Sequence, residues 1–242
     1  SYTWWGNHRK LAVSAAPNVT LGPEHVPANC WKAPLVILAP LMPEDLDAAA
    51  LTDAAARQSS GLLAKARAFL AGRRSSQKQV AILAQGLQRT LSKAGQVQYL
   101  PAPSPALVGA LGPHVSVFLS DVEVETWGSG REEGLAAVAA RVVVTQGEKG
   151  ALELTPNHPS RHIPAVKVET VDTNGAGDTF ATSYMLAEVF GSPAGLRDKG
   201  PGEVASWVAA DACSLPQSCK PGCVGRKLAA LGGQDGGGGG AG

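Results

Sequence analysis

The sequence has no long apolar run, no excess of one charge and few cysteines. Its longest apolar stretch, residues 33–42, is too short to cross a bilayer and contains two prolines, so no membrane association is expected. Lysine and arginine number 21 against 20 for aspartate and glutamate, without a basic cluster, so nucleic acid is not an expected partner. The chain opens on Ser1 without a secretory leader, and we predict a cytoplasmic protein.

The four cysteines are too few for a disulfide-rich scaffold of 242 residues and favour a reducing compartment. Cys213, Cys219 and Cys223 lie close together, but they lack CxxC spacing and a neighbouring histidine, which favours ordinary thiols over a zinc site. A dinucleotide-dependent oxidoreductase would need Gly-x-Gly-x-x-Gly after an early strand, but Gly175-Ala-Gly177 is followed by Phe180 where the third glycine should stand. The Gly-x-Ser-x-Gly of serine hydrolases is absent. Neither enzyme class is therefore expected.

Short β-favouring segments alternate with helical segments, as in a parallel sheet covered by helices on both faces. We predict an α/β fold of three layers around a mostly parallel central sheet. The expected buried strands are residues 35–39, 80–83, 115–119 and 141–145. The expected helices are residues 43–50, 61–71, 105–111 and 132–140. Ser104 and Pro105 give the third helix a capping hydroxyl and a proline in its first turn.

The pattern changes after residue 145. A strand pair at 151–154 and 162–168 should lead into a glycine-rich turn and a helix at 176–190. That helix places Phe180, Tyr184 and Ala187 on one buried face.

The two ends of the chain have different expected structures. Residues 1–16 are expected to form an extended hairpin outside the main sheet. Residues 232–242 are almost all glycine and are predicted to be disordered. We therefore expect one domain over residues 1–231.

Residues 171–180, Val-Asp-Thr-Asn-Gly-Ala-Gly-Asp-Thr-Phe, carry the strongest chemical signal. Gly175 and Gly177 let the backbone approach a ligand, and their N–H groups at a helix N-terminus favour an anion such as phosphate. Asp178 falls in the first helical turn, where its carboxylate can accept a proton from a hydroxyl. An isolated Gly-x-Gly-Asp is more often a plain turn with a capping aspartate, but an anion hole beside a base is sufficient for a kinase site.

Over its full length, this segment resembles the second signature of the PfkB family of ribokinase-like carbohydrate kinases. The resemblance implies that Gly175, Ala176 and Gly177 form the anion hole and that Asp178 is the catalytic base. It also implies a ribokinase-like fold, ATP and Mg²⁺ as cofactors, and a small sugar or polyol as substrate.

The same resemblance suggests further nucleotide contacts. Asp172 and Thr173 would approach ATP or a monovalent cation such as K⁺. Residues 142–150 resemble the family's strand followed by Thr-x-Gly-x-x-Gly, which implies that Thr145, Gly147 and Gly150 bind ATP. Open α/β folds bind ligands at the carboxyl edge of the sheet, where this strand ends. The segment alone also fits an ordinary β-turn.

Two other segments resemble family features less closely. Residues 118–123 resemble Asn-x-x-Glu, which organises magnesium through water; Glu123 matches the acidic position, and Ser120 replaces Asn and weakens the metal support. The alternative is a surface glutamate that caps a helix start. Residues 80–89 resemble a strand and turn of inositol and fructose kinases, but we interpret Gln85 and Arg89 as solvated turn residues.

The family's first signature, an N-terminal glycine pair, has no counterpart here, since the glycine pairs begin at Gly232. By resemblance the domain is N-terminally incomplete, and residues 1–16 would be lid strands. The leading hypothesis is an ATP-dependent kinase that phosphorylates a hydroxyl of a fructose-like sugar or myo-inositol. The alternative is a catalytically impaired relative that acts as a nucleotide-binding or partner-binding module. The sequence leaves the oligomeric state open.

Overall fold

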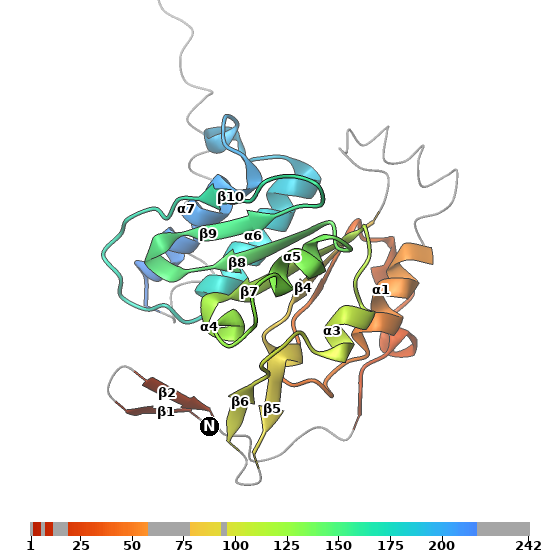
Figure 1. The fold of residues 1–242 in the computed structure, drawn as a ribbon. Helices are drawn as coiled ribbons and strands as arrows, with labels where there is room; N and C mark the ends of the chain where they lie inside the picture. Colours follow the sequence, from red (N-terminus) through yellow and green to blue (C-terminus); the bar gives the residue numbers. More distant parts are fainter. Residues whose placement is uncertain (1, 6–7, 12–18, 58–77, 93–95, 217–242) are drawn as a thin grey trace, which may run out of the picture.

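The computed structural model describes residues 2–5, 8–11, 19–57, 78–92 and 96–216. A six-stranded sheet with the order β10-β9-β8-β7-β4-β3 forms its centre (Figure 1). The parallel strands are β3 (Leu35–Leu38), β4 (Gln79–Leu83), β7 (Val115–Ser120) and β8 (Arg141–Thr145). The antiparallel strands are β9 (Ala151–Leu154) and β10 (Arg161–Ile163). The four predicted parallel strands and the mostly parallel sheet are confirmed.

The sheet separates two apolar cores, because successive side chains of a strand point to opposite faces. In β4, Val80 and Ile82 pack into one core and Ala81 and Leu83 into the other. The first core is covered by α1 (Ala48–Arg57), α3 (Pro105–Gly109) and α5 (Arg131–Ala136). The second is covered by α6 (Ala176–Phe190) and α7 (Pro201–Cys213), so the predicted three layers are confirmed (Figure 1).

The first helix begins later than predicted. Residues 42–45 instead form a turn in which the Asp45 carboxylate accepts hydrogen bonds from the N–H groups of Leu41 (2.8 Å) and Met42 (2.9 Å). The helix α1 starts after Asp47, whose carboxylate accepts from the N–H of Ala50 at 2.9 Å. The predicted start at residue 43 was wrong because these aspartates bind backbone groups at turns and caps.

Other helical predictions have mixed outcomes. The Ser104 hydroxyl accepts from the N–H of Leu107 at 3.1 Å, which confirms the predicted cap of α3. The helix expected at 132–140 is present as α5 but ends at Ala136. The helix predicted at 61–71 lies outside the described residues. A short helix that was not predicted, α4 (Asp121–Val124), follows β7 directly.

The C-terminal part contains one confirmed helix and one that was not predicted. The predicted face of α6 is buried, with Phe180, Tyr184 and Ala187 at most 6% exposed. The strand β10 ends at Ile163 and not near residue 168, because Pro164 has no N–H for the ladder. No prediction covered α7, which begins with Pro201.

Two antiparallel hairpins lie outside the main sheet. The pair β1 (Tyr2–Trp5) and β2 (His8–Leu11) confirms the hairpin expected near the start of the chain, and its role as a lid stays a prediction. The pair β5 (Arg89–Leu91) and β6 (Val97–Tyr99) was not predicted. Within the described segments, none of the helices has the length and apolar character needed to cross a membrane. The glycine-rich residues 232–242 are outside those segments.

Candidate active site

A network of charged and polar side chains fixes the direction of α6 on the sheet. Arg141, the first residue of β8, donates to the carboxylate of Glu188 at 3.0 Å. Glu188 lies near the C-terminus of α6, so that end of the helix lies over the amino end of β8. The N-terminus of α6, which carries Asp178, therefore lies toward the edge where the parallel strands end.

The same network buries the hydroxyl of Tyr184, which donates to Glu153 and accepts from Arg141. Burial raises the pKa of Tyr184 well above its ordinary value, and the hydrogen bond to Glu153 acts in the same direction. Arg161 donates from its Nε to the other oxygen of Glu153 at 2.7 Å. The network thus joins α6 to β8, β9 and β10.

The glycine-rich turn begins α6 as the sequence predicts. Gly175 is the N-cap with φ 73° and ψ 9°, a left-handed conformation that glycine adopts without steric cost. The space beside Gly175 and Gly177 is open, since an added Cβ would meet no atom within 4 Å. Asp178 is exposed in the first helical turn. The N–H of Ala176 donates to the carbonyl of Thr173 at 3.1 Å. The backbone of Gly175 and Gly177, in contrast, lies open beside the exposed carboxylate of Asp178.

The loop before this turn is anchored to the end of α7. The carbonyl oxygen of Cys213 accepts from the N–H groups of Val171 (2.9 Å) and Asp172 (3.1 Å). The Asp172 carboxylate accepts from the N–H of Asn174 at 2.9 Å, which closes a local turn. This support was not predicted, because α7 was not expected from the sequence. Glu203, whose carboxylate accepts from the N–H of Gly200 at 3.1 Å, was a usable start signal.

Residues at and after the end of β8 lie at the same edge of the sheet, but they differ in the groups that they can present to a ligand. The Thr145 hydroxyl donates to the carbonyl of Leu119 in β7 at 3.2 Å, so it also holds the two strands together. Gly147 has φ 57° and open space beside it. Gly150 has φ 95°, and a Cβ there would lie 2.1 Å from the carbonyl oxygen of Ile163. Packing against β10 is thus enough to require glycine at position 150.

Glu123 lies in the short helix that follows β7. Its side chain is buried, and one carboxylate oxygen accepts from the N–H of Ser120 at 2.6 Å. Burial raises the pKa of Glu123, while the hydrogen bonds from Ser120, the charge of Arg89 and the Gln85 side chain oppose that shift. Glu123 therefore caps a helix start, as the alternative interpretation has it, but it is buried and not on the surface.

Arg89 corrects the prediction of a solvated turn residue. It is only 5% exposed, and its guanidinium donates to the carbonyl of Leu41 at 3.1 Å. Gln85 is exposed, in agreement with the prediction. The burial of Arg89 depends on contacts with a turn that is distant in sequence, so the local sequence gave no sign of it.

Neither cysteine in the described segments takes part in a metal centre. Cys30 and Cys213 are not disulfide-bonded, whereas Cys219 and Cys223 lie outside those segments. No three histidine, cysteine, aspartate or glutamate side chains come together there in a metal-binding group.

The parallel sheet, its two helical layers and the glycine-rich helix start define a ribokinase-like α/β fold. Residues 41–215 match the model of the pfkB family carbohydrate kinases. This match covers most of the chain, which belongs to the PfkB family.

Curated relatives match parts of the chain. It is 31% identical over 112 residues to the bifunctional protein HldE of Pseudomonas fluorescens strain Pf-5, which is 41% of this chain and 24% of that protein. It is 54% identical over 39 residues to the deoxyribokinase of Salmonella typhi, which is 16% of this chain and 12% of that protein. The matches thus span a quarter or less of either relative.

Solved structures share the fold over more of the chain. A microbiome-derived acarbose kinase, Mak1, has a TM-score of 0.57 and 16% identity, covering 92% of this chain and 65% of that one. The adenosine kinase from Schistosoma mansoni in complex with 2-fluoroadenosine has a TM-score of 0.53 and 13% identity, covering 80% and 54%. At these identities the similarity shows the fold alone.

Proposed function

We propose that the chain is the catalytic part of an ATP-dependent kinase that transfers the γ-phosphoryl group to a hydroxyl of a sugar or polyol. The observation that carries this proposal is the position of Asp178. It is an exposed carboxylate one residue beyond Gly177, at the open N-terminus of a 15-residue helix.

In the proposed reaction, Asp178 accepts the proton of the substrate hydroxyl as its oxygen attacks the γ-phosphorus. The new oxygen–phosphorus bond forms as the bond to ADP breaks, and ADP leaves with the electron pair. The N–H groups of Gly175, Ala176 and Gly177 would stabilise the negative charge on the transferred group. That of Ala176 would do so by exchanging the carbonyl of Thr173, to which it donates at 3.1 Å, for a phosphate oxygen. Positioning and charge stabilisation of this kind supply most of the catalysis in phosphoryl transfer.

The open space beside Gly147, Gly175 and Gly177 fits a polyphosphate, because a backbone without side chains can come close to it. We assign Thr145, Gly147, Gly150, Asp172 and Thr173 to the ATP side of the site. For Thr145 and Gly150 this role would add to the structural roles described above. A K⁺ ion near Asp172 and Thr173 stays a prediction.

Magnesium, when bound to ATP, would neutralise part of the phosphate charge. Glu123 does not fit direct ligation, since its buried carboxylate already accepts the Ser120 N–H. Its assignment as the magnesium residue is therefore restricted to a contact through water.

Among acceptors, a fructose-like sugar and myo-inositol are the substrates that the sequence resemblance favours. Both offer several hydroxyl groups, one of which would face Asp178. An assay with each of them and ATP, with ADP release as the readout, compares the two directly.

The proposal is tested by the substitution Asp178→Asn. It removes the base but leaves the glycine turn intact, so we expect transfer to fall by about 10²–10⁴-fold while ATP affinity changes little. Calorimetry measures ATP binding, and a coupled assay measures ADP release with a panel of sugars and inositol. Asp198→Asn is the matched control, because Asp198 is an exposed carboxylate outside this site.

Unchanged turnover in the Asp178→Asn protein would show that Asp178 is not the base. ATP binding by the parent protein without transfer to any acceptor would favour the catalytically impaired relative. Absence of ATP binding would contradict the assignment of the glycine turn.

A further inference from the structure

The loop that joins β8 to β9 carries Gly147 and Gly150, two of the residues assigned to ATP. It comprises residues 146–150 and is mostly exposed. Within it, the N–H of Gln146 donates to the carbonyl of Gly150 at 2.7 Å, and the N–H of Gly150 donates to the carbonyl of Gly147 at 3.0 Å. A short exposed loop with two glycines keeps much conformational freedom unless another element restrains it.

His162 of β10 restrains this loop from outside. Its Nε2 lies 2.8 Å from the carbonyl oxygen of Lys149. Because a carbonyl oxygen only accepts, the ring nitrogen donates this hydrogen bond. The next residue, Gly150, packs so closely on β10 that an added Cβ would lie 2.1 Å from the carbonyl oxygen of Ile163. The loop therefore contacts β10 at two consecutive residues.

The strand β10 is itself held in place on several sides. The Nε of Arg161 donates to Glu153 in β9 at 2.7 Å. The side chain of Ile163 is 2% exposed and lies in the core under α6 and α7. Directly after the strand, the carbonyl of Pro164 accepts from the hydroxyl of Ser206 in α7 at 2.7 Å. The strand that carries the histidine is thus fixed to both the sheet and α7.

The helix α7 also holds the second segment assigned to the nucleotide. The carbonyl of Cys213, the last residue of α7, accepts from the N–H of Asp172 at 3.1 Å. On one side β10 is thus linked through α7 to the turn that begins α6. On the other side it is linked through His162 to the loop after β8. The two nucleotide segments are therefore connected to each other through β10.

We infer that His162 is a positioning residue for the nucleotide. It holds the loop 146–150, through the carbonyl of Lys149, in the conformation that receives ATP, and it does not contact ATP itself. A loop that is ordered before binding raises affinity, because the ligand does not have to order it. The restraint on the loop stands on the geometry alone, whereas its effect on ATP rests on the proposed function.

Hydrogen exchange of the free protein, followed by mass spectrometry, measures the restraint without a nucleotide. His162→Ala removes the donor, so the amides of residues 146–150 should exchange about 2–10-fold faster, while those of residues 174–180 should not change. His162→Gln keeps an N–H donor and should restore much of the protection. His162→Phe keeps a ring without a donor and should behave like His162→Ala.

Calorimetry and turnover assays measure the effect on the nucleotide with the same variants. His162→Ala and His162→Phe should raise the Kd for ATP by about 2–10-fold, and His162→Gln should lower it again toward the parent value. The kcat should change little, because Asp178 lies on a different turn. The effect should therefore appear in the KM for ATP and not in kcat.

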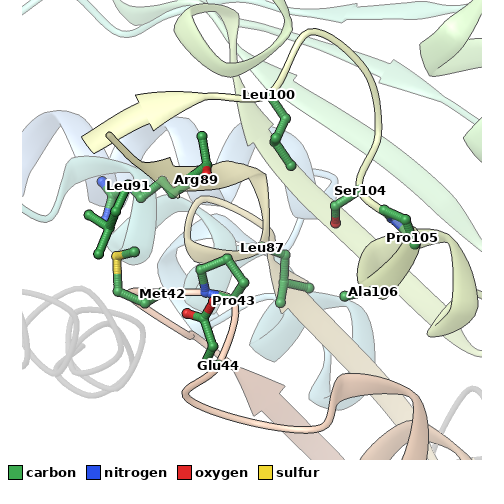
Figure 2. Close-up of a pocket in the computed structure, with 11 residues that line it drawn as sticks. Met42, Pro43, Glu44, Leu87, Arg89, Leu91, Leu100, Ser104, Pro105 and Ala106 are labelled. Atoms are coloured by element: carbon green, nitrogen blue, oxygen red, sulfur yellow. The ribbon is translucent and has the colours of Figure 1, made fainter. Parts of the chain in front are cut away.

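Two control variants should leave both loop exchange and ATP affinity at the parent values. His158→Ala changes an exposed histidine in the connection between β9 and β10. Ala106→Leu changes an exposed residue in the wall of a cavity of about 520 Å³ beside the hairpin β5–β6 (Figure 2). The described residues that line this cavity lie between Met42 and Ala106, so none of them belongs to the loop or to β10.

Unchanged exchange of residues 146–150 in His162→Ala would overturn the inference. Faster exchange with unchanged ATP affinity would overturn the positioning role, because the loop would then receive ATP without the restraint. Weaker ATP binding that His162→Gln does not restore, although loop exchange is restored, would show that the imidazole contacts the nucleotide directly. If the parent bound no ATP but the exchange changed as expected, the restraint would be supported and the proposed function alone would fail.

Discussion

Glu123 is a buried carboxylate that serves as a helix cap. The N–H of Ser120 stabilises its charged form, but the loss of solvent around the carboxylate has the larger effect and raises its pKa. The native protein thus holds the Glu123 proton more tightly than the unfolded chain does.

This difference predicts how stability varies with pH. Because the native pKa is raised, the contribution of Glu123 is fully present below the ordinary glutamate pKa and is lost as pH rises through the native value. Glu123→Gln keeps an acceptor for Ser120 but does not ionise. Its free energy of unfolding, relative to the parent, should therefore be higher at pH 7 than at pH 4.

Urea titrations at the two pH values measure the effect, with Glu125→Gln at an exposed position as the control. A relative stability of Glu123→Gln that does not change with pH would contradict a raised pKa.

The sequence predicted the positions of some site residues and not the burial or contacts of others. The helix start around Gly175 and Asp178 depends on local signals, namely glycines before a helical pattern, and the structure has the helix there. The burial of Arg89 and the anchoring of Asp172 by Cys213 depend on contacts between distant segments, so local patterns could not indicate them.

The hydroxyl of Tyr184 is one of the groups that tie helix α6 to the sheet, beside the ion pair of Arg141 with Glu188. Tyr184 lies between Arg141 and Glu153, and its ring also contacts Phe118 edge to face, with centroids 5.6 Å apart. Since α6 carries Asp178 at its other end, this contact helps to set the position of the proposed base.

Tyr184→Phe removes the hydroxyl and leaves Glu153 and Arg141 with one partner fewer. We expect a loss of about 1–3 kcal/mol in the free energy of unfolding at pH 7, measured by urea denaturation. Tyr99→Phe, at a half-buried position of β6, is the control and should change stability less. A loss equal to that of the control would show that the network contributes little.

The pH dependence gives a second measurement on the same variant. The raised pKa of Tyr184 means that its contribution is present below the ordinary tyrosine pKa of about 10 and declines as pH rises above it. The parent should therefore lose more stability than Tyr184→Phe between pH 9 and pH 11.

Helices and strands were predictable where the hydrophobic pattern and the local capping or turn residues indicate the same boundaries. The strands β4, β7 and β8 are mostly apolar, with Ser116 as the one interior polar residue, as expected when both faces of a sheet are covered. The start of α1 and the end of β10 were misplaced because aspartate capping and Pro164 outweigh the hydrophobic pattern. Pro201 and Glu203 are local start signals for α7, so this helix was predictable from the sequence.

The two apolar cores on either side of the central sheet share its strands, so they should unfold together. Ile82 and Leu83 are neighbours in β4 but lie in different cores. Ile82→Ala and Leu83→Ala should each lower the free energy of unfolding by about 2–5 kcal/mol and shift the same single transition. Circular dichroism and tryptophan fluorescence should then give coincident curves, with Val122→Ala, at an exposed position, as the control. Separate transitions for the two variants would contradict one cooperative unit.

The order of the central strands also affects how the chain reaches this fold. β3 pairs with β4, and β4 with β7, in parallel, and a long connection separates the partners of each pair in sequence. Such pairs gain their hydrogen bonds only after the intervening segment has lost the entropy of loop closure. We therefore expect the carboxyl edge that carries the site to assemble late, with a folding rate limited by the search for strand partners and not by helix formation.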